Sequence, residues 1–324
     1  MNATRRLAAI DIGTVTTRLL VADMTDGAIT EVVRSTDITH LGTGLTENGR
    51  LSEAAIGRVA GVVEGYARTT RDLGVERVTA LATSASRDAA NSDELLNALA
   101  VVGVTPRIID GEEEARLSFL GATWSVTGEG LLVVDVGGGS TELIFGESSL
   151  DEDGVRSCGI ETVRSVDVGS RRITEMFLRS DPPTPWELDE ARVYIAAALK
   201  PFFDALRTRP RTMLSLAGAA TTFSAIDMEL VEYDSGRVHL SCLTGPQLTD
   251  IIAMLACLPL EKRREVVGLH PDRAPVIVGG GLVVESVLAL AGLDSTLVSE
   301  HDILYGILLD TYRDLQQDDS VAES

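Results

Sequence analysis

The 324-residue sequence contains no apolar run close to the roughly 20 residues that a membrane-spanning helix needs. Its three cysteines, Cys158, Cys242 and Cys257, are odd in number and lack the spacing of metal ligands, so we expect reduced thiols and no disulfide framework. The N-terminal residues lead directly into an apolar segment that carries an acid, unlike a signal peptide. We therefore expect a cytoplasmic protein that binds no membrane.

Basic charge is also scarce. The net charge is −21, and only two of the 28 basic residues, Lys200 and Lys262, are lysines. This balance argues against broad electrostatic binding of nucleic acid. If the substrate is itself a polyanion, local arginines and metal ions must bind it. Arginine suits phosphate because its guanidinium forms paired hydrogen bonds, although genome composition explains the arginine bias equally well.

One short stretch occurs twice. Residues 131–145, LLVVDVGGGSTELIF, match residues 7–21, LAAIDIGTVTTRLLV, without a gap at an offset of 124 residues. Each copy predicts a β-hairpin whose first strand ends at an aspartate, Asp135 or Asp11. A glycine turn lets backbone amides approach an anion, and an aspartate beside phosphate requires a cation between them. The repeat predicts a duplicated chain with two metal-phosphate hairpins at a shared cleft; two unrelated hairpins are the alternative.

The rest of the chain alternates strand and helix patterns in both halves, which predicts an α/β protein with two cores. We expect further strands at 28–34, 78–82, 106–109, 163–168, 212–216 and 274–278, and helices at 51–73, 92–101, 115–122, 170–178, 186–208, 247–255, from 282 through 291 and at 302–316. The expected domains are residues 1–126, joined by the helix at 302–316, and residues 127–300, with a frayed acidic tail at 317–324.

The chain resembles the Ppx/GppA family of exopolyphosphatases and guanosine pentaphosphate phosphohydrolases, within the actin-like ATPase superfamily. The resemblance rests on seven ordered blocks, DIGTVTTRLLVAD, ATSASRDAAN, IIDGEEEARLSFLGA, VVDVGGGSTEL, SVDVGSRRITEMF, SLAGAATT and VIVGGGLVVESV, which extend from Leu7 to about Leu309. It implies a duplicated ribonuclease H-like (actin-like ATPase) fold, with two domains flanking a cleft. The chain is similar to the short members that lack a C-terminal helical domain.

The resemblance places catalysis on the glutamate directly before the Ala-Arg pair, which is Glu114. A carboxylate at a helix start can direct water onto phosphorus. Glu113 is the alternative, and first-turn acids also stabilise a helix N-terminus without any catalytic role. Arg87 is expected to stabilise charge on the transferring phosphoryl group. An ion pair of Arg87 with Asp88 is the structural alternative.

The resemblance also implies Mg²⁺ (or Mn²⁺) at Asp11, Asp135 and Glu142, since these ions prefer oxygen ligands. Glu142 could instead be an outward-facing strand residue. The expected hydroxyl and amide donors to phosphate are Thr14, Thr16, Thr17, Gly137, Gly138, Gly139, Ser140 and Thr141. Val15 stands where the family usually has asparagine, so one donor is lost from the first hairpin.

Three further groups have weaker functional interpretations. Gly218 and residues 279–281 occupy positions where superfamily kinases approach a nucleoside, although close packing also explains such glycines. The block with Arg164, Arg171 and Arg172 could line the path of a longer phosphate chain. The pair His301-Asp302 looks like a metal phosphohydrolase dyad, but without its partner residues we interpret it as chance.

The function that the resemblance implies is a metal-dependent exopolyphosphatase, which releases terminal orthophosphate from inorganic polyphosphate. A guanosine pentaphosphate 5′-phosphohydrolase would use the same residues and is the main alternative. A small-molecule kinase of the superfamily and a non-catalytic alarmone- or polyphosphate-binding relative also stay open. The resemblance suggests a homodimer.

Overall fold

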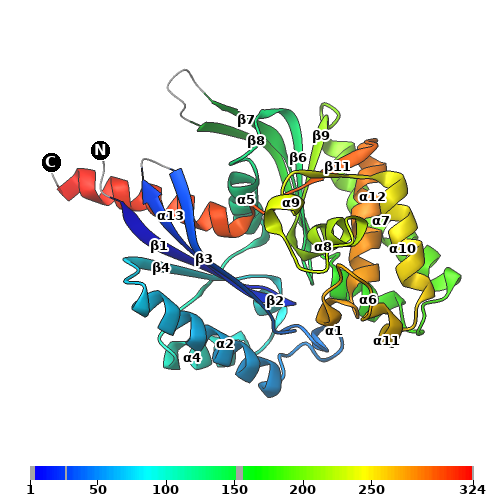
Figure 1. Cartoon of the computed structure of the whole chain (residues 1–324), viewed down its shortest axis with the longest axis horizontal. Coiled ribbons are helices and arrows are strands. Elements are labelled where there is room, and N and C mark those ends of the chain that lie inside the picture. Colours follow the sequence, from blue (N-terminus) through cyan, green and yellow to red (C-terminus); the bar gives the residue numbers. More distant parts are fainter. Residues whose placement is uncertain (1–3, 26–27, 151–155, 323–324) are drawn as a thin grey trace. The chain divides into compact units, whose positions relative to one another are not determined.

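The computed structural model describes residues 4–25, 28–150 and 156–322 (Figure 1). The chain folds as two compact units. The first unit consists of residues 1–121 together with 303–324, and the second unit of residues 122–302. Within the described ranges, every helix is too short or too polar to cross a lipid bilayer.

The first unit is built on a five-stranded sheet in the order β3-β2-β1-β4-β5. Its strands are β1 (Arg5–Ile12), β2 (Thr16–Thr25), β3 (Ala28–Ile38), β4 (Arg77–Ala82) and β5 (Arg107–Ile108). Strands β1, β2 and β3 form an antiparallel meander, whereas β4 and β5 run parallel to β1. This order places the carboxyl ends of β1, β4 and β5 at one edge of the sheet.

Helices cover both faces of this sheet. They are α1 (Leu45–Asn48), α2 (Glu53–Asp72), α3 (Ser84–Asp88), α4 (Ser92–Val101), α5 (Gly111–Ala122) and α13 (Ile303–Ala322). In Figure 1, α2 and α4 lie on one side of the strands and α13 on the other. Ile10 and Leu19 pack toward Val59 and Val63 of α2 in one buried cluster. The apolar runs of β1 and β2 are continuous because both of their faces are covered.

The second unit is built on a six-stranded sheet in the order β10-β11-β9-β6-β7-β8. Its strands are β6 (Gly128–Val136), β7 (Thr141–Leu150), β8 (Arg156–Val166), β9 (Thr212–Leu216), β10 (Ser241–Thr244) and β11 (Ser295–Val298). Its helices are α6 (Ser170–Phe177), α7 (Pro185–Ala205), α8 (Ala217–Asp227), α9 (Ser235–Val238), α10 (Gly245–Cys257), α11 (Leu260–Arg263), the 3₁₀ turn η1 (Pro271–Arg273) and α12 (Ile277–Ala291). One apolar core joins β6 and β7 to α7, α8, α10 and α12.

The two sheets share one plan. Each has a hairpin (β1-β2 or β6-β7), a third antiparallel strand beside it, and parallel strands on the other side of the first strand. The turns also correspond, because Gly13 N donates to Thr16 O at 2.9 Å and Gly137 N donates to Ser140 O at 3.0 Å. This agreement confirms the predicted α/β fold built from two similar halves.

One element prediction is wrong. Residues 274–278 were expected to form a strand that ends at the glycines, but Ile277 begins helix α12, which contains all three glycines. A β-carbon on Gly279 would lie 2.6 Å from Ser170 O and from Thr174 Oγ1. The glycines thus let α12 approach α6 closely, and this tertiary packing outweighs the strand preference of a β-branched run.

Smaller differences concern segments with few apolar residues. The short strands β10 and β11 and the short helix α1 were not predicted. Helix α7 ends at Ala205 rather than at Thr208. Helix α13 continues through Ala322, so most of the predicted acidic tail is helical, while residues 323–324 lie outside the described residues.

Candidate active site

Three predicted site residues gather at the carboxyl edge of the first unit's sheet. Asp11 is the next-to-last residue of β1, Arg87 follows β4 within α3, and Glu114 follows β5 in the first turn of α5. These three strands are parallel neighbours. Ligands of open α/β sheets bind at such an edge, so the topology alone brings these side chains into one region.

Arg87 and Glu114 are in direct contact. Arg87 Nη1 lies 2.6 Å from Glu114 Oε2 and also donates to Ile109 O at 3.0 Å. The two side chains are 21% and 12% exposed. The partly buried guanidinium therefore fixes the orientation of the carboxylate.

The structure distinguishes the three neighbouring glutamates. Glu112 is exposed. Glu113 accepts hydrogen bonds from both terminal nitrogens of Arg107 at 2.7 Å, and this carboxylate raises the pKa of the arginine. Only Glu114 among the three contacts Arg87. Of the two glutamates left open by the sequence, Glu114 is the one that the geometry associates with the predicted phosphate-binding arginine.

Asp11 has a partner that sequence reasoning missed. It lies opposite Arg18 in the β1-β2 register, and its Oδ2 accepts from Arg18 Nη2 at 2.6 Å and from Nε at 3.0 Å. The aspartate is 4% exposed. The repeat offset could have revealed this pair, because Arg18 occupies the position that Glu142 occupies in the second hairpin.

The second hairpin has two acids in the same places. Asp135 lies opposite Glu142 in the β6-β7 register, and the two residues are 7% and 1% exposed. Glu142 Oε1 accepts a hydrogen bond from Ser165 Oγ at 2.8 Å. Glu142 is thus buried rather than outward-facing. Two facing carboxylates at low exposure repel each other unless a cation or a shared proton lies between them.

The tip of the first hairpin is held from one side. Thr14 O accepts from Gly42 N at 2.9 Å, and Val15 O accepts from the amides of Thr39 and His40 at 2.9 Å each. In a planar trans peptide the carbonyl and the following N–H point in opposite directions. The amides of Val15 and of the next residue therefore point away from the segment that holds the tip.

The tip of the second hairpin is held in the same way by α6. Gly137 O accepts from Ser170 N, and Gly138 O accepts from Arg171 N, each at 2.9 Å. Arg172 Nε donates to the carbonyl of Gly139 at 2.8 Å. The amides of residues 138, 139 and 140 consequently point away from α6. Three successive amides that share a direction can form an anion-binding nest.

The predicted hydroxyl donors differ in their surroundings. Thr17 and Thr141 are 0% exposed; Thr17 shares a hydrogen bond with Thr39 at 3.0 Å, and Thr141 donates to Val168 O. Both hydroxyls therefore attach the hairpin to the segment after the third strand. Thr14 and Ser140 at the tips are 7% and 2% exposed, and Thr16 is half-buried. Phosphate binding by these hydroxyls stays a prediction.

The three arginines that were predicted to line a phosphate path lie beside other residues of the second unit. Arg171 is 8% exposed and lies 3.5 Å from Glu175 one turn further along α6. Arg172 binds the hairpin tip, as described above, and Arg164 lies in β8 opposite Leu143. A path for a phosphate chain along this block stays a prediction.

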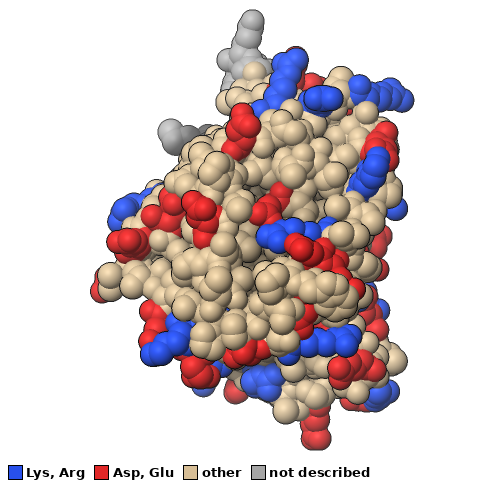
Figure 2. Space-filling model, turned by 90° about the vertical axis from the view of Figure 1, so that its right-hand side faces the viewer, with Lys and Arg blue, Asp and Glu red and all other residues tan. Residues whose placement is uncertain are grey.

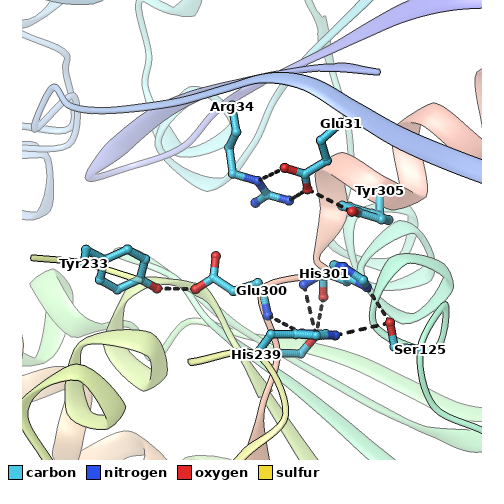
Figure 3. A network of polar contacts seen from close by, with 9 residues as sticks. Glu31, Arg34, Ser125, Tyr233, His239, Glu300, His301 and Tyr305 are labelled. Atoms are coloured by element: carbon cyan, nitrogen blue, oxygen red, sulfur yellow. Dashed lines mark hydrogen bonds and ion pairs between the residues drawn. The ribbon is translucent and has the colours of Figure 1, made fainter. Parts of the chain in front are cut away.

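His301 belongs to a cluster with other polar partners (Figure 3). Its Nδ1 lies 2.7 Å from Ser125 Oγ, and His239 Nε2 lies 3.3 Å from the same oxygen. Glu300 N donates to His239 Nδ1 at 3.2 Å, so this nitrogen is an acceptor. Among the described residues, no three His, Cys, Asp or Glu side chains are grouped to hold a metal.

Comparison with known proteins now places the chain in a family. The model of the Ppx/GppA phosphatase family matches residues 20–312. The chain belongs to this family. Exopolyphosphatase 2 of Mycobacterium tuberculosis is 39% identical over 328 aligned residues, which cover 95% of this chain and 98% of the relative.

Solved structures of Ppx/GppA proteins share the fold. The family member of Aquifex aeolicus matches with a TM-score of 0.79 at 31% identity, covering 96% of this chain and 99% of that one. An exopolyphosphatase of Cytophaga hutchinsonii matches with a TM-score of 0.85 at 25% identity, covering 95% and 98%. These matches confirm the predicted family and the predicted class of enzyme, a phosphoanhydride hydrolase.

In this Ppx/GppA protein the glycines expected near a nucleoside are used for packing. A β-carbon on Gly218 would overlap the guanidinium of Arg273, which fills that space. A β-carbon on Gly280 would lie 3.0 Å from Ala219 Cβ, and one on Gly281 would collide with the ring of Phe223. These contacts account for the glycines without a bound base.

Proposed function

We propose that this protein is a metal-dependent exopolyphosphatase, which hydrolyses the terminal phosphoanhydride bond of inorganic polyphosphate. The observation that carries the proposal is the 2.6 Å contact between Arg87 and Glu114 at the carboxyl edge of β1, β4 and β5. The mycobacterial relative named exopolyphosphatase matches this chain along almost its whole length, which supports polyphosphate as the substrate.

The carboxylates of the second hairpin fit a divalent cation. Asp135 and Glu142 present oxygen donors from facing positions of two strands, which is the ligand chemistry that Mg²⁺ or Mn²⁺ prefers. Asp11 fits less well, because Arg18 already neutralises its carboxylate. We therefore assign the cation to Asp135 and Glu142. Such an ion would offset the charge of the phosphate chain.

The chemistry would be carried by Glu114. Its carboxylate orients a water molecule and accepts a proton as the water oxygen bonds to the terminal phosphorus. The bond from that phosphorus to the bridging oxygen breaks, which yields orthophosphate and a chain shortened by one phosphate. Arg87 holds Glu114 in place and offsets negative charge on the phosphoryl oxygens. The amides of the hairpin tips bind further phosphate oxygens.

Guanosine pentaphosphate ranks second as a substrate. The space beside Gly218, where a nucleoside was expected to approach, is filled by Arg273, and the glycines of α12 pack against α6 and α8. At both groups of glycines, even a β-carbon would lie too close to neighbouring atoms. On the face shown in Figure 2, acidic and basic side chains alternate over the described residues, so a polyanion would depend on local arginines.

The test is a comparison of substrates and of two glutamate variants. Purified protein with Mg²⁺ is given long polyphosphate, tripolyphosphate, guanosine pentaphosphate and ATP, and released orthophosphate is measured. Long polyphosphate should have the highest kcat/KM. Glu114→Gln should lower kcat at least about 100-fold, as expected when a group that assists proton transfer is lost. Glu113→Gln is the matched control and should keep most activity, since Glu113 contacts Arg107 instead.

The proposal fails if guanosine pentaphosphate or ATP is turned over faster than polyphosphate. It also fails if Glu114→Gln retains activity close to that of the unchanged protein.

A further inference from the structure

Two buried hydroxyls in the first unit have no hydrogen-bond partner among the residues that the structure describes. They are the Oγ atoms of Ser84 and Ser86, and the two residues are 3% and 1% exposed. A buried polar atom without a partner destabilises a fold by about 1–3 kcal/mol. Natural proteins contain few such atoms, and each requires an explanation, of which a functional role is one.

Ser84 lies at the edge where the candidate active site is located. It is the first residue of α3, which follows directly after β4. The preceding Thr83 N donates to Ile12 O at 3.2 Å, so Ser84 is adjacent to the end of β1 and to the first hairpin. The start of α3 is therefore fixed beside a hairpin that is expected to bind phosphate.

The two serines differ in the direction of their side chains along α3. Positions three apart on a helix are neighbours on one face, which places Ser84 on the face of Arg87. Ser86 is two positions from Ser84, which is about 200° around the helix axis, and so lies on another face. Only one of the two unpartnered hydroxyls shares the side of the predicted phosphate-binding guanidinium.

We infer that Ser84 is a substrate-binding residue whose hydroxyl donates a hydrogen bond to an oxygen of the phosphoryl group that Arg87 binds. This inference rests on the proposed function, because it requires a substrate that ends in phosphate. A phosphoryl oxygen supplies the acceptor that the hydroxyl lacks in the free protein. Hydrogen bonds to a charged acceptor are stronger than neutral ones. The hydroxyl without an acceptor therefore lowers the stability of the free protein, and substrate binding removes this cost.

The test compares Ser84→Ala with Ser86→Ala, which is a matched control. Each change removes a buried hydroxyl that has no partner, so neither variant should have a lower Tm than the unchanged protein. Ser84→Ala should lower kcat/KM for polyphosphate by about 10- to 100-fold, the effect of one lost hydrogen bond to a charged group. Ser86→Ala should stay within about twofold. Ser84→Cys, which retains only a weak donor, should lie between Ser84→Ala and the unchanged protein.

Binding of inorganic tripolyphosphate, measured as a rise in Tm, separates this inference from the proposed function. If the unchanged protein releases no phosphate but tripolyphosphate stabilises it more than Ser84→Ala, the proposed function fails and the inference holds. If both kcat/KM and the rise in Tm are the same in Ser84→Ala and the unchanged protein, the inference is overturned. If tripolyphosphate neither binds nor is hydrolysed, both are overturned.

Discussion

Replacing Arg18 with methionine should destabilise the first unit by about 3 kcal/mol. Arg18 donates to one oxygen of Asp11 through two nitrogens at 2.6 and 3.0 Å, and the side chains are 14% and 5% exposed. Loss of one partner from a buried ion pair costs about 3–5 kcal/mol because the other charge stays desolvated. We take the lower end, since the arginine retains some exposure. The double variant Arg18→Met/Asp11→Asn should recover much of this loss because the charge of Asp11 is then removed together with that of Arg18.

Urea unfolding followed by circular dichroism measures the effect, and a loss of this size should lower the midpoint by about 1 M or more. Arg6→Met is the control. Arg6 and Asp23 pair across the same two strands at 2.7 and 2.9 Å, but their side chains are 36% and 27% exposed, so the loss should stay below about 1 kcal/mol. Equal losses in the two single variants, or no recovery in the double variant, would refute the reasoning from burial.

Two further predictions concern carboxylates of the second unit. Glu142→Gln should raise the Tm without divalent metal, because it removes the repulsion between two acids at facing positions of β6 and β7, and should reduce the stabilisation by Mg²⁺; an unchanged Mg²⁺ effect would place the ion elsewhere. Hydrogen bonds, first of all from the backbone N–H of Thr184, lower the pKa of Glu187 from 4.5 to about 2. The resulting stability is complete above pH 4.5 and is lost as pH falls toward 2. Glu187→Gln should therefore lower the free energy of unfolding by about 2 kcal/mol at pH 7. It should also weaken the dependence of this free energy on pH below pH 4.5, and a dependence equal to that of the unchanged protein would contradict the prediction.

Local sequence signals were sufficient to predict a helix whose ends are marked by particular residue types. Ser52 stands at the start of the helix that was predicted at residues 51–73 and is a residue type favoured as an N-cap; its Oγ accepts from Ala55 N at 3.2 Å. Gly74 directly follows the same predicted helix, and its φ is +64°, a conformation that glycine adopts without strain. The duplicated hairpins were equally accessible, because apolar positions, aspartates and turn residues recur at one offset.

Tertiary contacts decided what the sequence did not predict. An apolar β-branched run before glycines fits a buried strand as well as a helix, and the close approach of α6 and α8 makes residues 277–291 helical. The pairing of Arg87 with Glu114 crosses 27 residues of chain and depends on the neighbouring positions of β4 and β5. Only the strand order places these two side chains together.

The two hairpins differ in charge at one corresponding position. Arg18 and Glu142 occupy the same position of the two hairpins, each opposite an aspartate. In the first unit the resulting pair carries no net charge, and the neighbouring Arg87 also neutralises Glu114. In the second unit, when both acids are ionised, the pair carries two negative charges at positions that are 7% and 1% exposed. This difference in charge is the reason why we propose that the second hairpin binds the cation.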